Sequence, residues 1–221
     1  MGITIHYKGK LKDPVLVYSL TDELKDISEI MKWDYSIMDK DLDEPMTAEL
    51  LNHENRVEIS GHLPLKGIII NLHPGCEKLS LFFDKDGYLQ SVLNMVLNTK
   101  ESRKSDNNYL FIKTQFTPPE IHIAIVKLLK YLKNKYITNL EVIDEGGYWE
   151  NEDKELLIQK ISFLNRKIVQ VEELISSIKD EFNHLSTDEA IILLEKTLRE
   201  KLSNGSYYND SYPDIHISKY C

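Results

Sequence analysis

Polar and aromatic residues that could carry out chemistry follow two expected strands in the middle of the chain. The first strand, at 109–112, leads into a helix that begins near residue 119, and the second strand, at 140–143, follows that helix. Parallel strands joined by a crossover helix end at the same edge of a sheet, where ligands tend to bind. The side chains expected together at this edge are Gln115, His122, Asp144, Glu145, Tyr148 and Trp149.

This group of side chains supports two interpretations. It can bind a cation or a basic side chain, and His122 with a carboxylate can perform general acid–base chemistry. An anion is disfavoured because Glu120, Asp144 and Glu145 would repel it. The alternative is structural: residues 144–147 form a good turn, the aromatic rings cover the core, and His122 bonds a backbone carbonyl. The sequence leaves both interpretations open.

His73 and Cys76 form a second, weaker candidate site, for a metal ion or for a thiolate with its base. The chain has only one other cysteine, Cys221, so the second half of a zinc site is missing. The segment 72–77 also has the composition of an ordinary turn, and a lone cysteine is usually a small buried hydrophobic residue.

Two strand-helix-strand units position these residues. Residues 3–8 alternate between apolar and polar, as in a half-buried strand. A helix follows with apolar residues from Leu20 to Met31 and a cap at Ser19 or Thr21, and then a short strand at 35–38. The second unit has a buried strand at 109–112, a capping box at 117–120, a helix to about residue 135 and a return strand at 140–143.

The segment between these units contains further strands and turns. Strands are expected at 56–60, 67–72 and 78–84, and one helical turn at 47–51. Asp86 and Gly87 predict a type I′ turn that places 88–92 against 79–83. The polar stretch 98–108 is the expected flexible loop.

The C-terminal part has a heptad pattern. Eight apolar residues follow one another at spacings of four and three, which predicts one continuous helix over 152–184: Leu157, Ile161, Leu164, Ile168, Val171, Ile175, Ile178 and Phe182. A second capping box at 186–189 starts a shorter helix, 187–203, which Asn204 and Gly205 end. This seam packs either within the chain, where Ile158 and Leu174 widen the stripe, or against a second copy, where Lys167 and Glu172 are complementary.

These elements predict an α+β fold with a mixed sheet, two crossover units and a C-terminal helical hairpin. The expected parts are an α+β body at 1–150, the hairpin at 151–205 and a tail at 206–221, where 215–217 has the pattern of an edge strand.

Composition limits the class of protein. The 221 residues include 36 acidic and 27 basic ones, a net charge of −9 that opposes broad binding to nucleic acid. Two distant cysteines indicate a reducing compartment. We find no signal peptide, myristoylation pattern or apolar run long enough for a membrane span, so a cytoplasmic protein is expected.

Several segments of the body resemble an uncharacterised family of bacterial cytoplasmic proteins, over about residues 1–160. They are 3–10, 76–77, 83–87, 113–116, 119–122 and 144–150. The resemblance implies no activity. It does draw attention to His122, Cys76 and the acidic-aromatic turn.

We therefore expect a non-enzymatic interaction or regulatory protein without a cofactor. It would be a homodimer that assembles through the hairpin and binds a protein partner, and the acid excess fits an immunity-protein or antitoxin-like role. The alternative is a small hydrolase or metal-dependent enzyme that uses His122 with Asp144 or Glu145, helped by Cys76.

Overall fold

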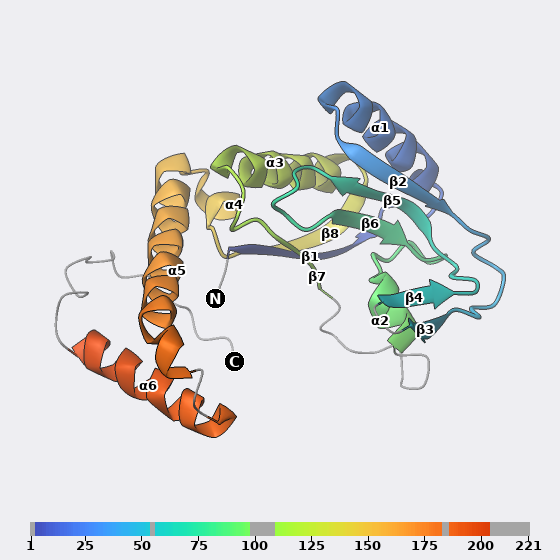
Figure 1. Cartoon of the computed structure of the whole chain (residues 1–221). Helices are drawn as coiled ribbons and strands as arrows, with labels where there is room; N and C mark the ends of the chain where they lie inside the picture. The colour runs from blue at the N-terminus through green and yellow to red at the C-terminus, as the bar shows by residue number, and fades with distance from the viewer. Residues whose placement is uncertain (1–2, 54–55, 98–108, 183–185, 204–221) are drawn as a thin grey trace. The chain divides into compact units, whose positions relative to one another are not determined.

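The computed structural model of the chain describes residues 3–53, 56–97, 109–182 and 186–203 (Figure 1). The chain divides into two compact units, Met1–Ser162 and Phe163–Cys221. The boundary lies inside a helix, twelve residues beyond the expected end of the body at residue 150. Leu157 and Ile161 in the first turns of that helix are buried, which explains why this part of it belongs to the first unit.

The first unit is an α+β structure, as predicted. Its strands are β1 (Thr4–Leu11), β2 (Asp34–Asp39), β3 (Glu49–His53), β4 (Arg56–Ser60), β5 (Lys66–Asn71), β6 (Leu79–Phe83), β7 (Leu110–Lys113) and β8 (Ile137–Asp144). Its helices are α1 (Leu16–Met31), α2 (Val92–Leu97), α3 (Pro119–Lys135), α4 (Tyr148–Asn151) and the start of α5 (Lys154–Phe182).

The described strands form three sheets, ordered β7-β1-β8, β2-β5-β6 and β3-β4. All pairings within them are antiparallel, so these sheets replace the single mixed sheet that we expected. The second crossover unit is present: β7 and β8 both run antiparallel to β1 and therefore parallel to each other, with α3 joining them. The first unit differs, because β1 and β2 belong to different sheets.

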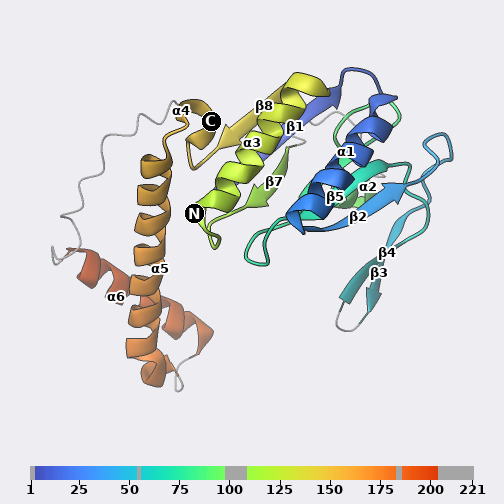
Figure 2. The same ribbon diagram turned by 90° about the horizontal axis from the view of Figure 1, so that it is seen from above.

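Helices α1 and α3 lie side by side over the two larger sheets (Figure 2). α1 buries Val17, Leu20, Leu24 and Ser28 on one face, spaced by three or four residues as a helix requires. It begins at Leu16, so Ser19 and Thr21 lie inside the helix and the expected cap there is wrong. Lys32 ends it in the left-handed conformation, with φ of 56°.

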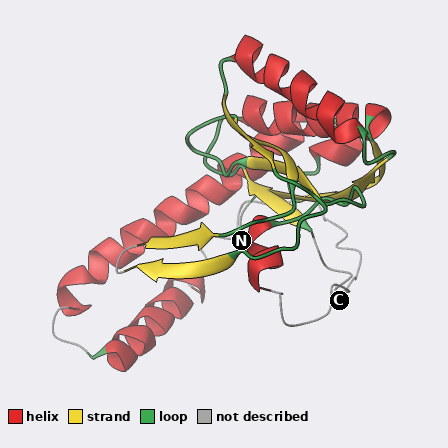
Figure 3. Ribbon diagram, turned by 90° about the vertical axis from the view of Figure 1, so that its right-hand side faces the viewer, coloured by secondary structure: helices red, strands yellow, loops and turns green. Residues whose placement is uncertain are grey.

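A separate apolar cluster covers the other side of the β2-β5-β6 sheet. Its buried members are Ala48, Leu63, Leu65, Phe82 and Val96. The β3-β4 hairpin projects beside α2 (Figure 3). Residues 49–51, where we expected a helical turn, belong to β3 and pair with β4.

The turn at Asp86 and Gly87 is only partly as predicted. The Gly87 N–H donates to the Asp84 carbonyl at 2.9 Å, so Lys85 and Asp86 are the central residues of the turn. Neither has positive φ, so the turn is not type I′. The returning chain makes one bridge to β6, between Phe83 and Leu89, and then enters α2. The expected loop at 98–108 and the tail at 206–221 lie outside the described residues.

The second unit contains the rest of α5 and α6 (Thr187–Ser203). α5 is unbroken over 29 residues, close to the helix expected at 152–184. The capping box at the start of α6 is present: the Ser186 N–H donates to the Glu189 carboxylate at 2.9 Å, and the Ser186 hydroxyl does so at 2.7 Å. None of the described helices combines the length and the apolarity needed to cross a membrane.

Candidate functional site

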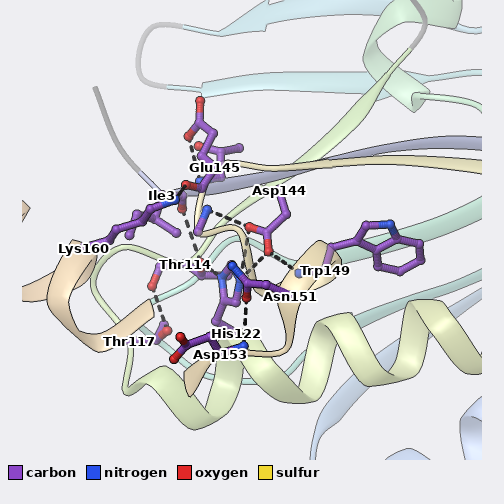
Figure 4. A network of polar contacts seen from close by, with 12 residues as sticks. Ile3, Thr114, Thr117, His122, Asp144, Glu145, Trp149, Asn151, Asp153 and Lys160 are labelled. Carbon is purple, nitrogen blue, oxygen red and sulfur yellow. Dashed lines mark hydrogen bonds and ion pairs between the residues drawn. The ribbon is translucent and has the colours of Figure 1, made fainter. Parts of the chain in front are cut away.

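His122 lies at the centre of a buried polar network between α3 and the end of β8 (Figure 4). Its Nε2 atom is 3.1 Å from both carboxylate oxygens of Asp144, and both side chains are fully buried. Because an ionised carboxylate only accepts hydrogen bonds, Nε2 is the donor. The crossover topology therefore brings His122 and Asp144 together across 22 residues of sequence.

Asp144 is held by backbone amides as well as by His122. Its carboxylate accepts the Gly146 N–H at 2.7 Å and the Trp149 N–H at 2.9 Å. Burial raises the pKa of Asp144, but the hydrogen bond to His122, the charge of that ring and the two amides outweigh it, so the pKa lies below its ordinary value. The carboxylate is therefore ionised at neutral pH.

Thr114 occupies the other side of the imidazole ring. Its hydroxyl oxygen lies 2.8 Å from His122 Nδ1 and 3.2 Å from the carbonyl oxygen of Ile3, and its own N–H donates to that carbonyl at 2.9 Å. The strand exit was singled out in the sequence, but not this hydroxyl. The sequence feature that could have identified Thr114 is its position, because it follows a strand that ends beside the start of the helix carrying His122.

The loop before α3 differs from the expected capping box. The Thr117 hydroxyl donates to the Thr114 carbonyl at 2.8 Å instead of capping the helix, and α3 starts at Pro119 without a side-chain cap. Gln115 is buried beside Thr114 in the chain, and its Oε1 atom has no hydrogen-bond partner among the described residues. The loop thus joins the buried network through Thr114.

Gly146 is required by the close approach of His122. A Cβ atom at Gly146 would lie 2.9 Å from the His122 Cε1 and Nε2 atoms and 2.8 Å from Leu157 Cδ1. Real side chains do not pack this closely, so the first of the two glycines lets the turn close over the ring. Gly147 has φ of +79°, in the left-handed region that glycine favours.

The other candidate residues of this edge have structural partners. Glu145 points away from His122 (Figure 4) and accepts the Thr4 N–H at 2.9 Å. Tyr148 is buried, whereas the Trp149 ring lies 5.5 Å from the ammonium groups of Lys130 and Lys133. The contact of Glu145 joins the end of β8 to β1, and the contacts of Trp149 join α4 to α3.

His73 and Cys76 form a turn. The ring Nδ1 of His73 accepts the Gly75 N–H at 2.9 Å, and the Cys76 thiol donates to the His73 carbonyl at 3.4 Å. Burial raises the pKa of the Cys76 thiol, which opposes a role as nucleophile. Across the part of the chain that the structure describes, no group of three His, Cys, Asp or Glu residues is placed to hold a metal ion.

The order hydroxyl, imidazole, carboxylate is that of a nucleophile with its base and orienting acid. Here Thr114, His122 and Asp144 are all buried, so a substrate would have to displace packed atoms to reach them. In the structure, these three residues join β7, α3 and β8 by charge-assisted hydrogen bonds. Removing His122 is therefore expected to destabilise the fold, in contrast to the small effect expected for a surface site.

The sequence did not indicate which residues the opposite face of the β7-β1-β8 sheet exposes. Phe111 was expected in a buried strand, but its side chain is 57% exposed, and Ile143 is 53% exposed. Both pair directly with His6 of the central strand. The alternation at 3–8 placed His6 on one face with Thr4 and Lys8. The neighbouring strands β7 and β8 show no clear alternation of apolar and polar residues, so the sequence does not indicate which of their residues share that face.

The chain matches no known family of proteins, no curated protein and no solved structure in the comparisons. The resemblance of the body to bacterial cytoplasmic proteins thus remains a prediction.

Proposed function

We propose that the chain is a non-enzymatic interaction protein that assembles with a second copy through its C-terminal helices. The observation that carries this proposal is the exposure of the heptad seam beyond its buried start at Leu157 and Ile161: Val171 is 43% exposed and Ile175 is 42% exposed. On α6, Ile191 and Ile192 are exposed as well. Isoleucine at the a positions 161, 168 and 175, with Leu164 at a d position, favours a pair of parallel helices.

The charges beside the seam support a second copy as the occupant. In a parallel pair, Lys167 of one helix lies next to Glu172 of the other helix, which flanks the seam in the following heptad. Such flanking pairs add little energy and select the register and orientation of the helices.

The rival proposal is a small hydrolase or metal-dependent enzyme that uses His122 with Asp144 or Glu145. Its requirement is a reacting atom within about 3 Å of both groups. The burial of His122 and Asp144 and the outward direction of Glu145 favour a structural role for these residues instead. We also propose a cytoplasmic location and a protein partner, and the acid excess supports an immunity-protein or antitoxin-like role.

The test is the double variant Ile168→Lys, Ile175→Lys, with Val169→Lys, Ser176→Lys as matched control. Both pairs place two lysines seven residues apart on α5, but the control pair lies one residue further along and off the seam. A buried lysine without a partner is costly, so at a few micromolar the seam variant should have the mass of one chain by light scattering. The control should keep the mass of a dimer. Equal masses for both variants, or a monomeric wild-type protein, would overturn the proposal.

A further inference from the structure

The open face of the β7-β1-β8 sheet carries three rows of side chains, each crossing all three strands. Strand register gives the middle row as Phe111, His6 and Ile143. One neighbouring row has Lys113, Thr4 and Glu145, and the other has Tyr109, Lys8 and Glu141. Alternation along the strands turns these residues away from α3, whose side of the sheet holds Ile5, Tyr7 and Asp144.

The middle row is apolar at both ends and exposed. Phe111 and Ile143 lie on opposite edges of the sheet, with the ring of His6 between them and 6.3 Å from the ring of Phe111. A face of this composition, with apolar residues at the centre and charged rows beside them, has the layout of a protein–protein interface.

The charges of this face are distributed unevenly between its two edges. The β7 edge carries Lys113, whose ammonium group lies 5.6 Å from the ring of Phe116. The β8 edge carries Glu141 and Glu145. The row of Lys113, Thr4 and Glu145 therefore changes from basic to acidic over two strand spacings, about 10 Å.

We propose that this face packs against the same face of a second copy of the chain, about a two-fold axis parallel to β1. Such an axis places β7 of one copy opposite β8 of the other and leaves the rows aligned. Lys113 then faces Glu145 of the partner, and Phe111 faces Ile143 of the partner. Each of these contacts occurs twice, as an isologous interface requires.

The sheet geometry permits this packing. Sheets that pack face to face keep their strands within about 30° of each other. The charged rows lie only about 7 Å from the middle row along the strands, so a rotation of one sheet by up to about 30° moves them by a few ångströms, within the reach of lysine and glutamate side chains.

A nucleic acid fits this face less well, although aromatic and basic residues are both present. Lys8 is paired with Glu141 at 3.1 Å, and Glu145 lies in the same row as Lys113. Carboxylates this close would repel phosphates wherever the lysines attract them. A second copy instead supplies a carboxylate for the lysine and a lysine for the carboxylate.

The contact is small, so the association should be weak. β1 and β8 have eight residues each and β7 has four, so the face measures at most roughly 14 Å by 26 Å. That is less than half of the roughly 800 Å² per partner typical of stable complexes. We expect a dissociation constant of tens to hundreds of micromolar. This contact does not depend on α5, and its test is designed to be independent of the proposed function.

The test is a charge exchange measured by sedimentation equilibrium up to several hundred micromolar, in the Ile168→Lys, Ile175→Lys background. In that background the chain should still dimerise with increasing concentration. Lys113→Glu and Glu145→Lys should each weaken the dimer at least tenfold. Mixing the two single variants, or combining both changes in one chain, should restore the dimer. In both cases residue 113 of each copy again faces a residue 145 of opposite charge.

Three controls keep the result interpretable. Asp22→Lys makes the same charge change as Glu145→Lys on an exposed position of α1 and should leave the association unchanged. Phe111→Ala should weaken the dimer, whereas Ile30→Ala, also on α1, should not. If the background variant does not fold, Lys113→Glu and Glu145→Lys are each made in the wild-type chain and then mixed. The average mass of the mixture should exceed that of either variant alone.

The inference is overturned if the background variant stays monomeric throughout this range, or if the charge exchange fails to restore what the single changes remove. The Ile168→Lys, Ile175→Lys variant could stay monomeric up to several hundred micromolar and also have a lower mass than the wild type at a few micromolar. That result would contradict the open-face contact and leave the proposed function intact. A protein or nucleic acid as the true occupant would give the same monomeric result and would therefore also contradict the proposal.

Discussion

Each of the two faces of the β7-β1-β8 sheet includes side chains that are unusual for its surroundings. Between this sheet and α3, His122 of the helix is hydrogen-bonded to Thr114 and to Asp144, and all three side chains are buried. The solvent face exposes Phe111 and Ile143. Residue types that can take part in catalysis therefore do not by themselves identify a functional site. Burial assigns a structural role to the first face, and for the exposed second face we propose a role in binding.

The largest effect should come from breaking the buried network at its charge. Asp144→Ala removes the acceptor for His122 and for two backbone amides, and should lower the free energy of unfolding by roughly 3–5 kcal/mol. Glu145→Ala, at the next residue and exposed, should cost less than about 1 kcal/mol. Urea unfolding measures both. Equal small losses would mean that the network is dispensable and that the structural assignment is wrong.

A second substitution tests how tightly the turn closes over His122. Gly146→Ala adds a methyl group 2.9 Å from the ring of His122, which is fully buried. We expect a loss of about 1–3 kcal/mol, typical of overpacking. A melting temperature equal to that of the wild type would show that the turn does not press on the ring.

A third, partly exposed cluster joins α1 to α3, and its carboxylate makes the free energy of unfolding depend on pH. Glu23 accepts hydrogen bonds from Lys135, at 2.8 Å to each oxygen, and from Tyr131 and Tyr136. Burial raises the pKa of Glu23, but these partners outweigh it and lower the pKa from 4.5 to about 2.

Because the folded pKa is depressed, the stabilisation by Glu23 is fully present above pH 4.5 and is lost as the pH falls towards 2. The free energies of unfolding of the wild type and of Glu23→Gln should therefore differ at pH 7 and converge near pH 2. A difference that stays constant over this range would contradict the depressed pKa.

The smallest effect on stability should come from the open face. Phe111→Ser and Ile143→Ser remove exposed side chains, so the melting temperature measured at low concentration should change by no more than a few degrees. A large loss for either variant would mean that the residue belongs to the core, and the contrast between the two faces would disappear.

Local patterns predicted the fold where the signal lies within one element. The spacing in α5 and the capping box at Ser186 set helix bounds within two residues of those observed. The expected mixed sheet failed because pairing partners such as β1 and β7 are about a hundred residues apart, and no local pattern specifies them. The turn at 47–51 failed because pairing with β4 overrode the local preference of a short segment.

The candidate site shows the same limit. Crossover topology correctly predicted that His122 and Asp144 meet, since both positions follow from the order of the elements. Burial did not follow, because it depends on Gly146 and Leu157 closing over the ring. The open row was missed because Tyr109 to Ile112 is continuously apolar and hides which residues face solvent.

The most direct test of the contrast between the two faces is the modification of individual histidines by diethyl pyrocarbonate, followed by peptide mass spectrometry at low and high protein concentration. We expect His122 to stay unmodified in the folded protein at every concentration, because its ring is fully buried. His6 should react at low concentration and become protected as copies associate through the open face. Modification of His122 as fast as that of His6, or reaction of His6 at one rate at all concentrations, would contradict the account.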